Sequence, residues 1–253
     1  MNVENENAGE PKAKPWGFWP TVGFSLIIFI VYTVIQAVIL VIFAVVAALG
    51  TENFNFEQHI KGLESNGLFL AMATCAAAPF TIGMTMLFAK IRKHITIKEY
   101  LCLHRAGWKE LAGWSLALLA FVVCSDTLTY LLHRPVVPEF MLNAYKTAYF
   151  TPLLWFALVI AAPLTEEILF RGFLFKGIEC SRIGPVGAVI ISALAWSAMH
   201  LQYGAYGLAN IFAGGLLLGF ARFRSKSIYP SIVMHALQNI IATVEVIICL
   251  RMT

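Results

Sequence analysis

The amino-acid sequence predicts an all-α, polytopic membrane protein with about seven transmembrane helices. The chain of 253 residues is 59% hydrophobic and 13% charged, with a mean hydropathy of +0.76. Soluble domains are roughly 45–50% apolar and about 25% charged, so this composition is typical of a membrane protein. Apolar runs of about 20 residues, the length that a helix needs to cross a bilayer, recur along the chain. The basic residues also alternate between loops as a membrane topology requires.

Seven apolar runs account for the predicted helices. The first is about twice as long as a signal-peptide core of ~7–15 residues, so it predicts a retained span. The fifth and sixth runs are short, so six to eight helices are compatible with the sequence. In order, the predicted spans are Val22–Leu49, Leu68–Phe88, Leu111–Leu132, Thr151–Lys176, Pro185–His200, Gly207–Phe220 and Ile228–Leu250.

The basic residues predict the orientation of these helices. With the intramembrane Arg171 left out, 13 Lys and Arg residues lie in the N-terminal tail and in alternate loops, and 4 lie on the opposite side. The positive-inside rule places the richer side, and with it the N-terminus, in the cytoplasm. We therefore expect a polar cytoplasmic tail over 1–21, a three-helix membrane part over 22–150 and a four-helix membrane core over 151–253.

The loop 90–110 is the longest of the basic cytoplasmic segments. It mixes Lys and Arg with Ile, Leu and Tyr. Such a loop either lies on the membrane surface against anionic headgroups or is an ordinary solvated loop, and the sequence favours neither alternative.

Other features of the composition argue against particular classes of function. The net charge of +4 is weak support for any charged partner, and we expect no nucleic acid among the partners. The five cysteines are odd in number and contain no CxxC pair, so neither a disulfide framework nor a zinc ribbon is predicted.

The predicted fourth span contains three charged residues within the stretch PLTEEILFRGF. One charge at the centre of a membrane helix costs about 2.5–3.5 kcal/mol on insertion scales. Glu167 and Arg171 are four residues apart, so on a helix they share a face and can form an ion pair. Glu166 points about 100° away and has no partner on its own helix. We expect its partner to come from another helix.

Candidate partners for Glu166 lie on later spans. The stretch ALAWSAMH places His200 one turn after Trp196, and SIVMHALQN places His235 and Asn239 four residues apart on one helix face. A carboxylate and an imidazole can hold and deprotonate a water molecule. A second imidazole and an amide can donate to the oxyanion that then forms. These residues together favour hydrolysis within the membrane.

A polar side chain in a membrane helix can also serve only to hydrogen-bond a neighbouring helix. We favour that interpretation for four further residues, Asp126, Asn210, Gln238 and Glu245.

Three short motifs resemble those of the CPBP family, the CAAX-protease and bacteriocin-processing membrane proteins. EEILFR corresponds to the family's EExxxR motif, WSAMH to FxxxH with Trp196 in place of Phe, and HALQN to HxxxN. They occur in the family's order, from Glu166 to Asn239, and within apolar helices. The resemblance covers about the last hundred residues, whereas the first 150 carry no motif of this family.

The resemblance implies an intramembrane glutamate protease related to the type II CAAX prenyl endopeptidases. Such an enzyme would hydrolyse a peptide bond of a membrane-associated protein or peptide, in CAAX-type or precursor-peptide processing. It implies that Glu166 and His200 activate water, and that His235 and Asn239 form the oxyanion hole. The same resemblance makes the core 151–253 catalytic and gives a supporting role to Glu167, Arg171 and Trp196.

We expect Trp196 to alter packing more than chemistry, because an aromatic ring is kept at that position. No cofactor is implied, and no residue is assigned as a metal ligand. The expected partners are membrane lipid and a peptide or protein substrate, and a helper protein that presents the substrate is compatible with the sequence. The expected location is the inner membrane of a bacterial cell, as a multi-pass protein.

Other functions account for parts of this pattern. A zinc metalloprotease could use a Glu and two His residues, but no HExxH motif occurs. A serine hydrolase lacks the GxSxG motif. A transporter could relay protons through Glu and His, although repeated broken helices are not visible. A non-catalytic scaffold or bacteriocin-immunity protein would keep the fold without needing the complete Glu/His/His/Asn set.

Overall fold

The computed structural model describes residues 14–50 and 55–252, and in these residues all regular structure is helical. Six helical stretches are long and apolar enough to cross a membrane, which confirms the predicted all-α membrane fold. They are α1 (Phe18–Leu49), α3 (Gly67–Lys90), α5 (Trp108–Leu131), the continuous stretch Thr151–Glu179, η3 with α11 (Leu201–Ser225), and α12 (Tyr229–Met252).

The remaining apolar helix, α10 (Gly184–Ser197), corresponds to the short fifth span that the sequence predicts. Its 14 residues extend about 21 Å at 1.5 Å per residue, less than the ~30 Å of a bilayer core. Each predicted span therefore has a counterpart, although one counterpart is too short to cross. Three further short helices lie in the connections, namely α2 (Phe56–Leu63), α4 (Ile97–Tyr100) and α6 (Glu139–Lys146).

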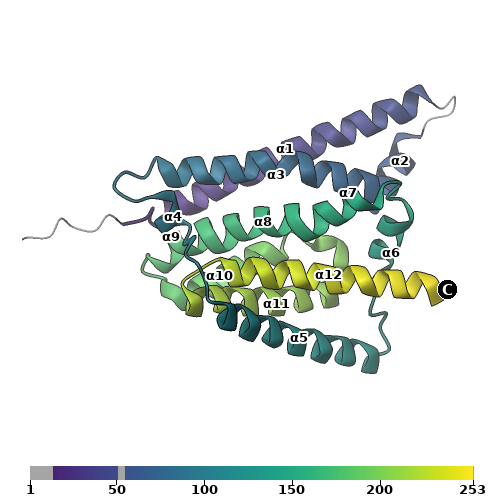
Figure 1. Cartoon of the computed structure of the whole chain (residues 1–253). Coiled ribbons are helices and arrows are strands. Elements are labelled where there is room, and N and C mark those ends of the chain that lie inside the picture. Colours follow the sequence, from purple (N-terminus) through teal and green to yellow (C-terminus); the bar gives the residue numbers. More distant parts are fainter. Residues whose placement is uncertain (1–13, 51–54, 253) are drawn as a thin grey trace, which may run out of the picture.

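The connections between the spans gather at two ends of the bundle (Figure 1). At one end the Arg92 Nε donates a hydrogen bond to the Lys14 carbonyl at 2.8 Å. At the same end the Ile228 N–H donates to the Cys102 carbonyl at 3.2 Å. The N-terminal tail, the 90–110 loop and the start of α12 therefore meet, as the alternation of basic residues predicts. That this end faces the cytoplasm stays a prediction.

The 90–110 loop packs against the protein, which neither alternative for it anticipates. Tyr100 and Leu101 are fully buried, and the Tyr100 ring stacks on Phe173 at 5.3 Å between ring centroids. A capping box between Thr96 and Glu99 starts the short helix α4 and turns these apolar residues inward. The apolar residues of this loop thus cover the end of the bundle.

Two predicted helix ends differ in the structure. α10 ends at Ser197, whereas the predicted span extends to His200. The His200 N–H donates to the Ser197 carbonyl at 2.9 Å, a bond from i to i−3 that tightens the last turn. α11 (Gly204–Ser225) is longer than the predicted Gly207–Phe220. The pattern of apolar residues stops at Arg222, which the structure nevertheless buries within the helix.

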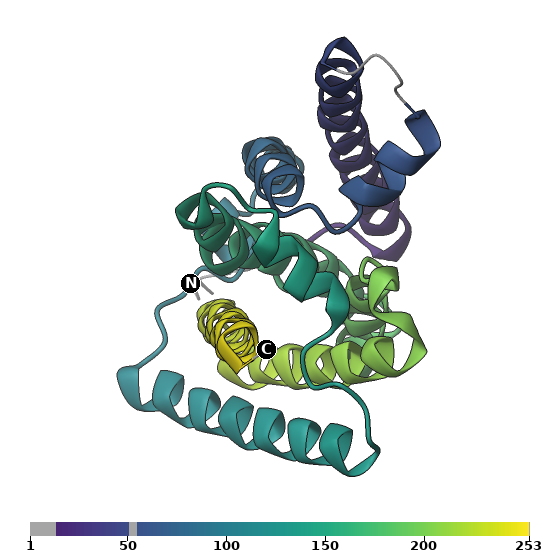
Figure 2. The same cartoon turned by 90° about the vertical axis from the view of Figure 1, so that its right-hand side faces the viewer.

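The stretch Thr151–Glu179, called the motif helix below, occupies the centre of the bundle (Figure 2). Half of its apolar window is buried, against 6% for each of the peripheral helices α1 and α5. α3 packs against one side of the motif helix and α12 against another. The peripheral helices expose large apolar side chains, which suits contact with lipid because their backbone groups are satisfied within each helix.

Candidate active site

The motif helix is not a regular α-helix. It contains two π-helical segments, one on each side of the double glutamate. In order it consists of α7 (Thr151–Phe156), η1 (Ala157–Ala161), α8 (Ala162–Glu167), η2 (Ile168–Leu174) and α9 (Phe175–Glu179). π-Helical turns are rare and are found frequently at functional sites.

Both π-helical segments offer a backbone carbonyl to another helix. The Asn239 Nδ2 of α12 donates to the Leu158 carbonyl in η1 at 2.7 Å. The Arg222 Nε of α11 donates to the Arg171 carbonyl in η2 at 3.0 Å. Because a π turn shifts the backbone register from i+4 to i+5, carbonyls beside it can accept such bonds. The irregular motif helix is thereby tied to α11 and α12.

Glu167 and Arg171 form the ion pair that their four-residue spacing predicts. Both side chains are fully buried, and Arg171 Nη1 lies 2.8 Å from Glu167 Oε1. Arg171 Nη2 also donates to the Gly215 carbonyl at 3.3 Å. A Cβ atom on Gly215 would lie only 3.0 Å from the ring of Trp196, so glycine permits this close approach of α11.

His235 connects the two glutamates. Its Nδ1 lies 2.9 Å from Glu167 Oε1, and its Nε2 lies 3.9 Å from Glu166 Oε2. Since an ionised carboxylate can only accept hydrogen bonds, Nδ1 carries a proton in this arrangement. Glu166, Glu167 and Arg171 together carry one net negative charge when all three are ionised. A doubly protonated His235 would make the cluster neutral.

Trp196 contacts Glu166, Arg171 and the two histidines. Its Nε1–H donates a hydrogen bond to Glu166 Oε2. The Arg171 guanidinium lies over its ring at 4.6 Å from the centroid, and the rings of His200 and His235 meet it edge-on at 5.1 and 5.2 Å. The sequence comparison with FxxxH indicated mainly a packing role. The hydrogen bond is an additional feature, because Phe has no group that could donate it.

His200 lies in the turn that follows α10. Its Nδ1 is 3.0 Å from the Trp196 carbonyl. A carbonyl can only accept, so Nδ1 is the protonated nitrogen, and Nε2 of the neutral ring is left as a proton acceptor.

The four predicted catalytic residues line a single cavity. Its volume is about 380 Å³, within the ~300–1,000 Å³ of typical ligand sites. The side chain of Glu166 is 21% exposed, whereas that of its neighbour Glu167 is fully buried. This cavity is called the catalytic cavity below, after the role proposed for it. Its lining residues from the three sequence motifs are Glu166, Trp196, His200, His235 and Asn239.

Part of the wall of the catalytic cavity comes from outside the motif region. Helices α1, α3 and α6 contribute side chains there that the sequence analysis did not single out. They are ordinary polar and apolar residues, and no motif or spacing marks them. The residues concerned are Tyr32, Gln36, Leu70, Thr74, Phe140 and Met141.

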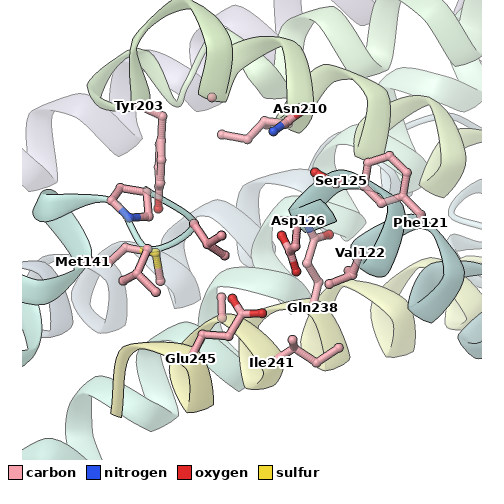
Figure 3. A pocket seen from close by; sticks show the side chains of 16 residues that line it. Phe121, Val122, Ser125, Asp126, Met141, Tyr203, Asn210, Gln238, Ile241 and Glu245 are labelled. Carbon is pink, nitrogen blue, oxygen red and sulfur yellow. The ribbon is translucent and has the colours of Figure 1, made fainter. Parts of the chain in front are cut away.

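A second cavity of about 170 Å³ adjoins the first and shares Tyr203 and Gln238 with it (Figure 3). Asp126 in α5 and Glu245 in α12 both line this second cavity. Asn210 completes the set of four residues that the sequence assigned to interhelical contacts, and all four line this cavity.

Within residues 14–50 and 55–252, no group of three or more His, Cys, Asp or Glu side chains is placed to hold a metal ion.

Comparison with known proteins supports the same region. No curated protein and no solved structure matches the chain. Residues 148–241 match the sequence model of the family described as Type II CAAX prenyl endopeptidase Rce1-like. The match begins just before the motif helix and ends within α12, so it includes Glu166, His200, His235 and Asn239. This match at residues 148–241 confirms the resemblance that was inferred from the three short motifs.

Proposed function

We propose that the protein is an intramembrane glutamate protease that cleaves a membrane-associated protein or peptide of the CAAX type. One observation carries the proposal: Glu166, His200, His235 and Asn239 of the Rce1-like segment line one cavity. The site combines a proton acceptor with hydrogen-bond donors, as hydrolysis of an amide requires.

Glu166 and His200 are the groups that activate water in this proposal. Trp196 holds Glu166 Oε2, and because His200 Nδ1 donates to the Trp196 carbonyl, Nε2 is the proton acceptor of the neutral ring. The oxygen of a water molecule between them attacks the substrate carbonyl carbon while its proton passes to Glu166. The C–N bond then breaks, and Glu166 returns the proton to the leaving amine. The products are an amine and a carboxylic acid, which releases its remaining proton to become a carboxylate.

Asn239 and His235 stabilise the oxyanion. Asn239 uses one Nδ2 hydrogen for the Leu158 carbonyl, which leaves the second hydrogen for the oxyanion. His235 gives its Nδ1 hydrogen to Glu167, so only the doubly protonated ring has an Nε2 hydrogen to donate. Such donors are stronger in a site that excludes water.

The protein is an integral multi-pass membrane protein. We further place it in the inner membrane of a bacterial cell, with the basic end of the bundle in the cytoplasm. In this orientation the substrate is a protein or peptide at the membrane, with or without a helper protein that presents it.

The direct test is cleavage of a prenylated CAAX peptide by the purified protein in lipid nanodiscs. We expect mass spectrometry to detect release of the C-terminal tripeptide at the same rate with and without a strong chelator. The same peptide without its prenyl group is the matched control for substrate class. Loss of cleavage on chelation, with recovery on addition of Zn²⁺, would establish a metalloprotease. Failure to cleave either peptide would contradict CAAX-type activity.

Trp196→Phe tests the hydrogen bond that distinguishes this chain from the FxxxH pattern. We expect kcat/KM to fall by about 10- to 100-fold, since a hydrogen bond to a charged group contributes about 1.5–3 kcal/mol. Trp114→Phe is the matched control, because Trp114 packs edge-on against Phe220 and does not line the catalytic cavity. An unchanged kcat/KM in Trp196→Phe would show that Trp196 contributes by packing and that its hydrogen bond is not needed for activity.

A further inference from the structure

A small recess adjoins the catalytic cavity between α1, α3 and α8. Its volume is about 40 Å³. Glu166, Tyr32 and Thr74 line both the recess and the catalytic cavity. The recess also contains Thr81 and Thr165, and it is called the threonine recess below. Glu166 therefore faces two spaces, one of about 380 Å³ and one of about 40 Å³.

The hydroxyl group of Thr81 has no partner among the described residues. Thr81 is 2% exposed, and its Oγ1 makes no hydrogen bond. Neighbouring buried threonines behave differently: Thr85 donates to the Thr81 carbonyl at 2.7 Å, and Thr165 donates to the Ala161 carbonyl at 2.6 Å. An unsatisfied buried hydroxyl costs about 1–3 kcal/mol. Because Thr81 lines the recess, a small polar molecule bound there can supply the partner that its hydroxyl lacks.

The size and the polar groups of the recess fit water. A water molecule needs roughly 10–15 Å³ of such space and two to four polar partners, and the recess offers about 40 Å³. Thr81 can donate, the Thr165 oxygen keeps a lone pair, and Glu166 can accept. Within the described residues Glu166 Oε2 is bonded to Trp196, whereas Oε1 makes no hydrogen bond. The second carboxylate oxygen is therefore available to a water in the recess.

We propose that the threonine recess holds the water that resupplies Glu166, with Thr81 as a water-positioning residue. Each turnover consumes one water molecule, and an apolar substrate that fills the catalytic cavity displaces water from it. A second space that reaches Glu166 from α3 keeps a water beside the carboxylate. The apolar walls of Phe29, Leu169 and Phe170 offer that water few other partners. The inference that water occupies the recess is based on the geometry alone. The inference that this water takes part in hydrolysis rests on the proposed function.

X-ray radiolytic labelling tests the occupancy without any substrate, because hydroxyl radicals formed from bound water oxidise the side chains beside it. Phe170 is the reporter, since it is 6% exposed and lines the recess but not the catalytic cavity. We expect labelling of Phe170 in the unmodified protein and a decrease of about tenfold in Thr81→Val. Thr81→Ser keeps the hydroxyl and should keep the labelling.

Thr85→Val is the matched control. Thr85 is buried on the same helix, but its hydroxyl is already bonded to the Thr81 carbonyl. Thermal unfolding of all variants checks that the fold is retained. Equal labelling of Phe170 in the unmodified protein and in Thr81→Val overturns the proposal, and so does an unmodified protein in which Phe170 is not labelled.

Cleavage kinetics test the use of this water. We expect Thr81→Val to lower kcat about tenfold with little change in KM, because the hydroxyl does not contact the substrate. Thr81→Ser and Thr85→Val should keep the original kcat. A protein that cleaves no peptide while Phe170 labelling still depends on Thr81 would refute the proposed function but not the water site. An unchanged kcat in Thr81→Val would refute the role of this water in catalysis.

Discussion

Glu166→Gln is expected to lower kcat for peptide cleavage by about 10²–10⁴-fold, the range that a general base contributes. The amide has nearly the shape of the carboxylate, and its oxygen can still accept the hydrogen bond from Trp196. What it loses is the ability to take a proton from water. His200→Ala should give a loss of the same order, because Nε2 of His200 is the other proton acceptor in the catalytic cavity.

The matched control for Glu166→Gln is Glu179→Gln. Glu179 lies on the same motif helix and pairs with Lys176 at 3.2 Å, with 22% of its side chain exposed. It lies outside the catalytic cavity, so kcat should not change. The measurement is kcat on the CAAX peptide, with folding checked by thermal unfolding. Unchanged kcat in Glu166→Gln or in His200→Ala would remove that residue from the proposed chemistry.

The features that the sequence predicts well are those that depend on local patterns. Length and apolarity mark a membrane span, and the basic loops place the helix ends at opposite sides of the membrane. The pairing of Glu167 with Arg171 follows from helix geometry alone and is present as predicted. Helix geometry also separates Glu166 from Glu167, and the structure buries only Glu167 completely.

The features that the sequence does not predict depend on contacts between helices. In a π turn the backbone hydrogen bond spans five residues instead of the four of an α turn. No pattern of residues in this chain indicates where the π turns occur. The hydrogen bond from Trp196 to Glu166 forms only because α10 packs close to the motif helix, and the sequence does not give that distance. The burial of Arg222 depends on the Arg171 carbonyl that a π turn makes available. Residues such as Tyr32 and Gln36 reach the cavity only through the packing of α1.

The sequence motifs therefore identify one wall of the site, and tertiary packing supplies the other. The family match covers residues 148–241, whereas the cavity also includes side chains from α1, α3 and α6. Since these helices line the same cavity as Glu166, differences in substrate among proteins with the same motifs can arise there. The sequence predicts that the core at 151–253 is catalytic and is separate from the membrane part at 22–150. Because both parts line the cavity, this division stays a prediction.

Glu167→Gln is expected to destabilise the fold by about 3–5 kcal/mol, because it leaves the Arg171 cation buried without its partner. The double variant Glu167→Leu with Arg171→Leu removes both charges and should be less destabilised than Glu167→Gln. Unfolding by denaturant in lipid nanodiscs measures both. The matched control is Glu57→Gln, which breaks a pair with Lys61 at the same four-residue spacing but on the exposed surface, where ion pairs contribute little. A Glu167→Gln protein that is as stable as the unmodified protein but inactive would instead assign Glu167 to the chemistry.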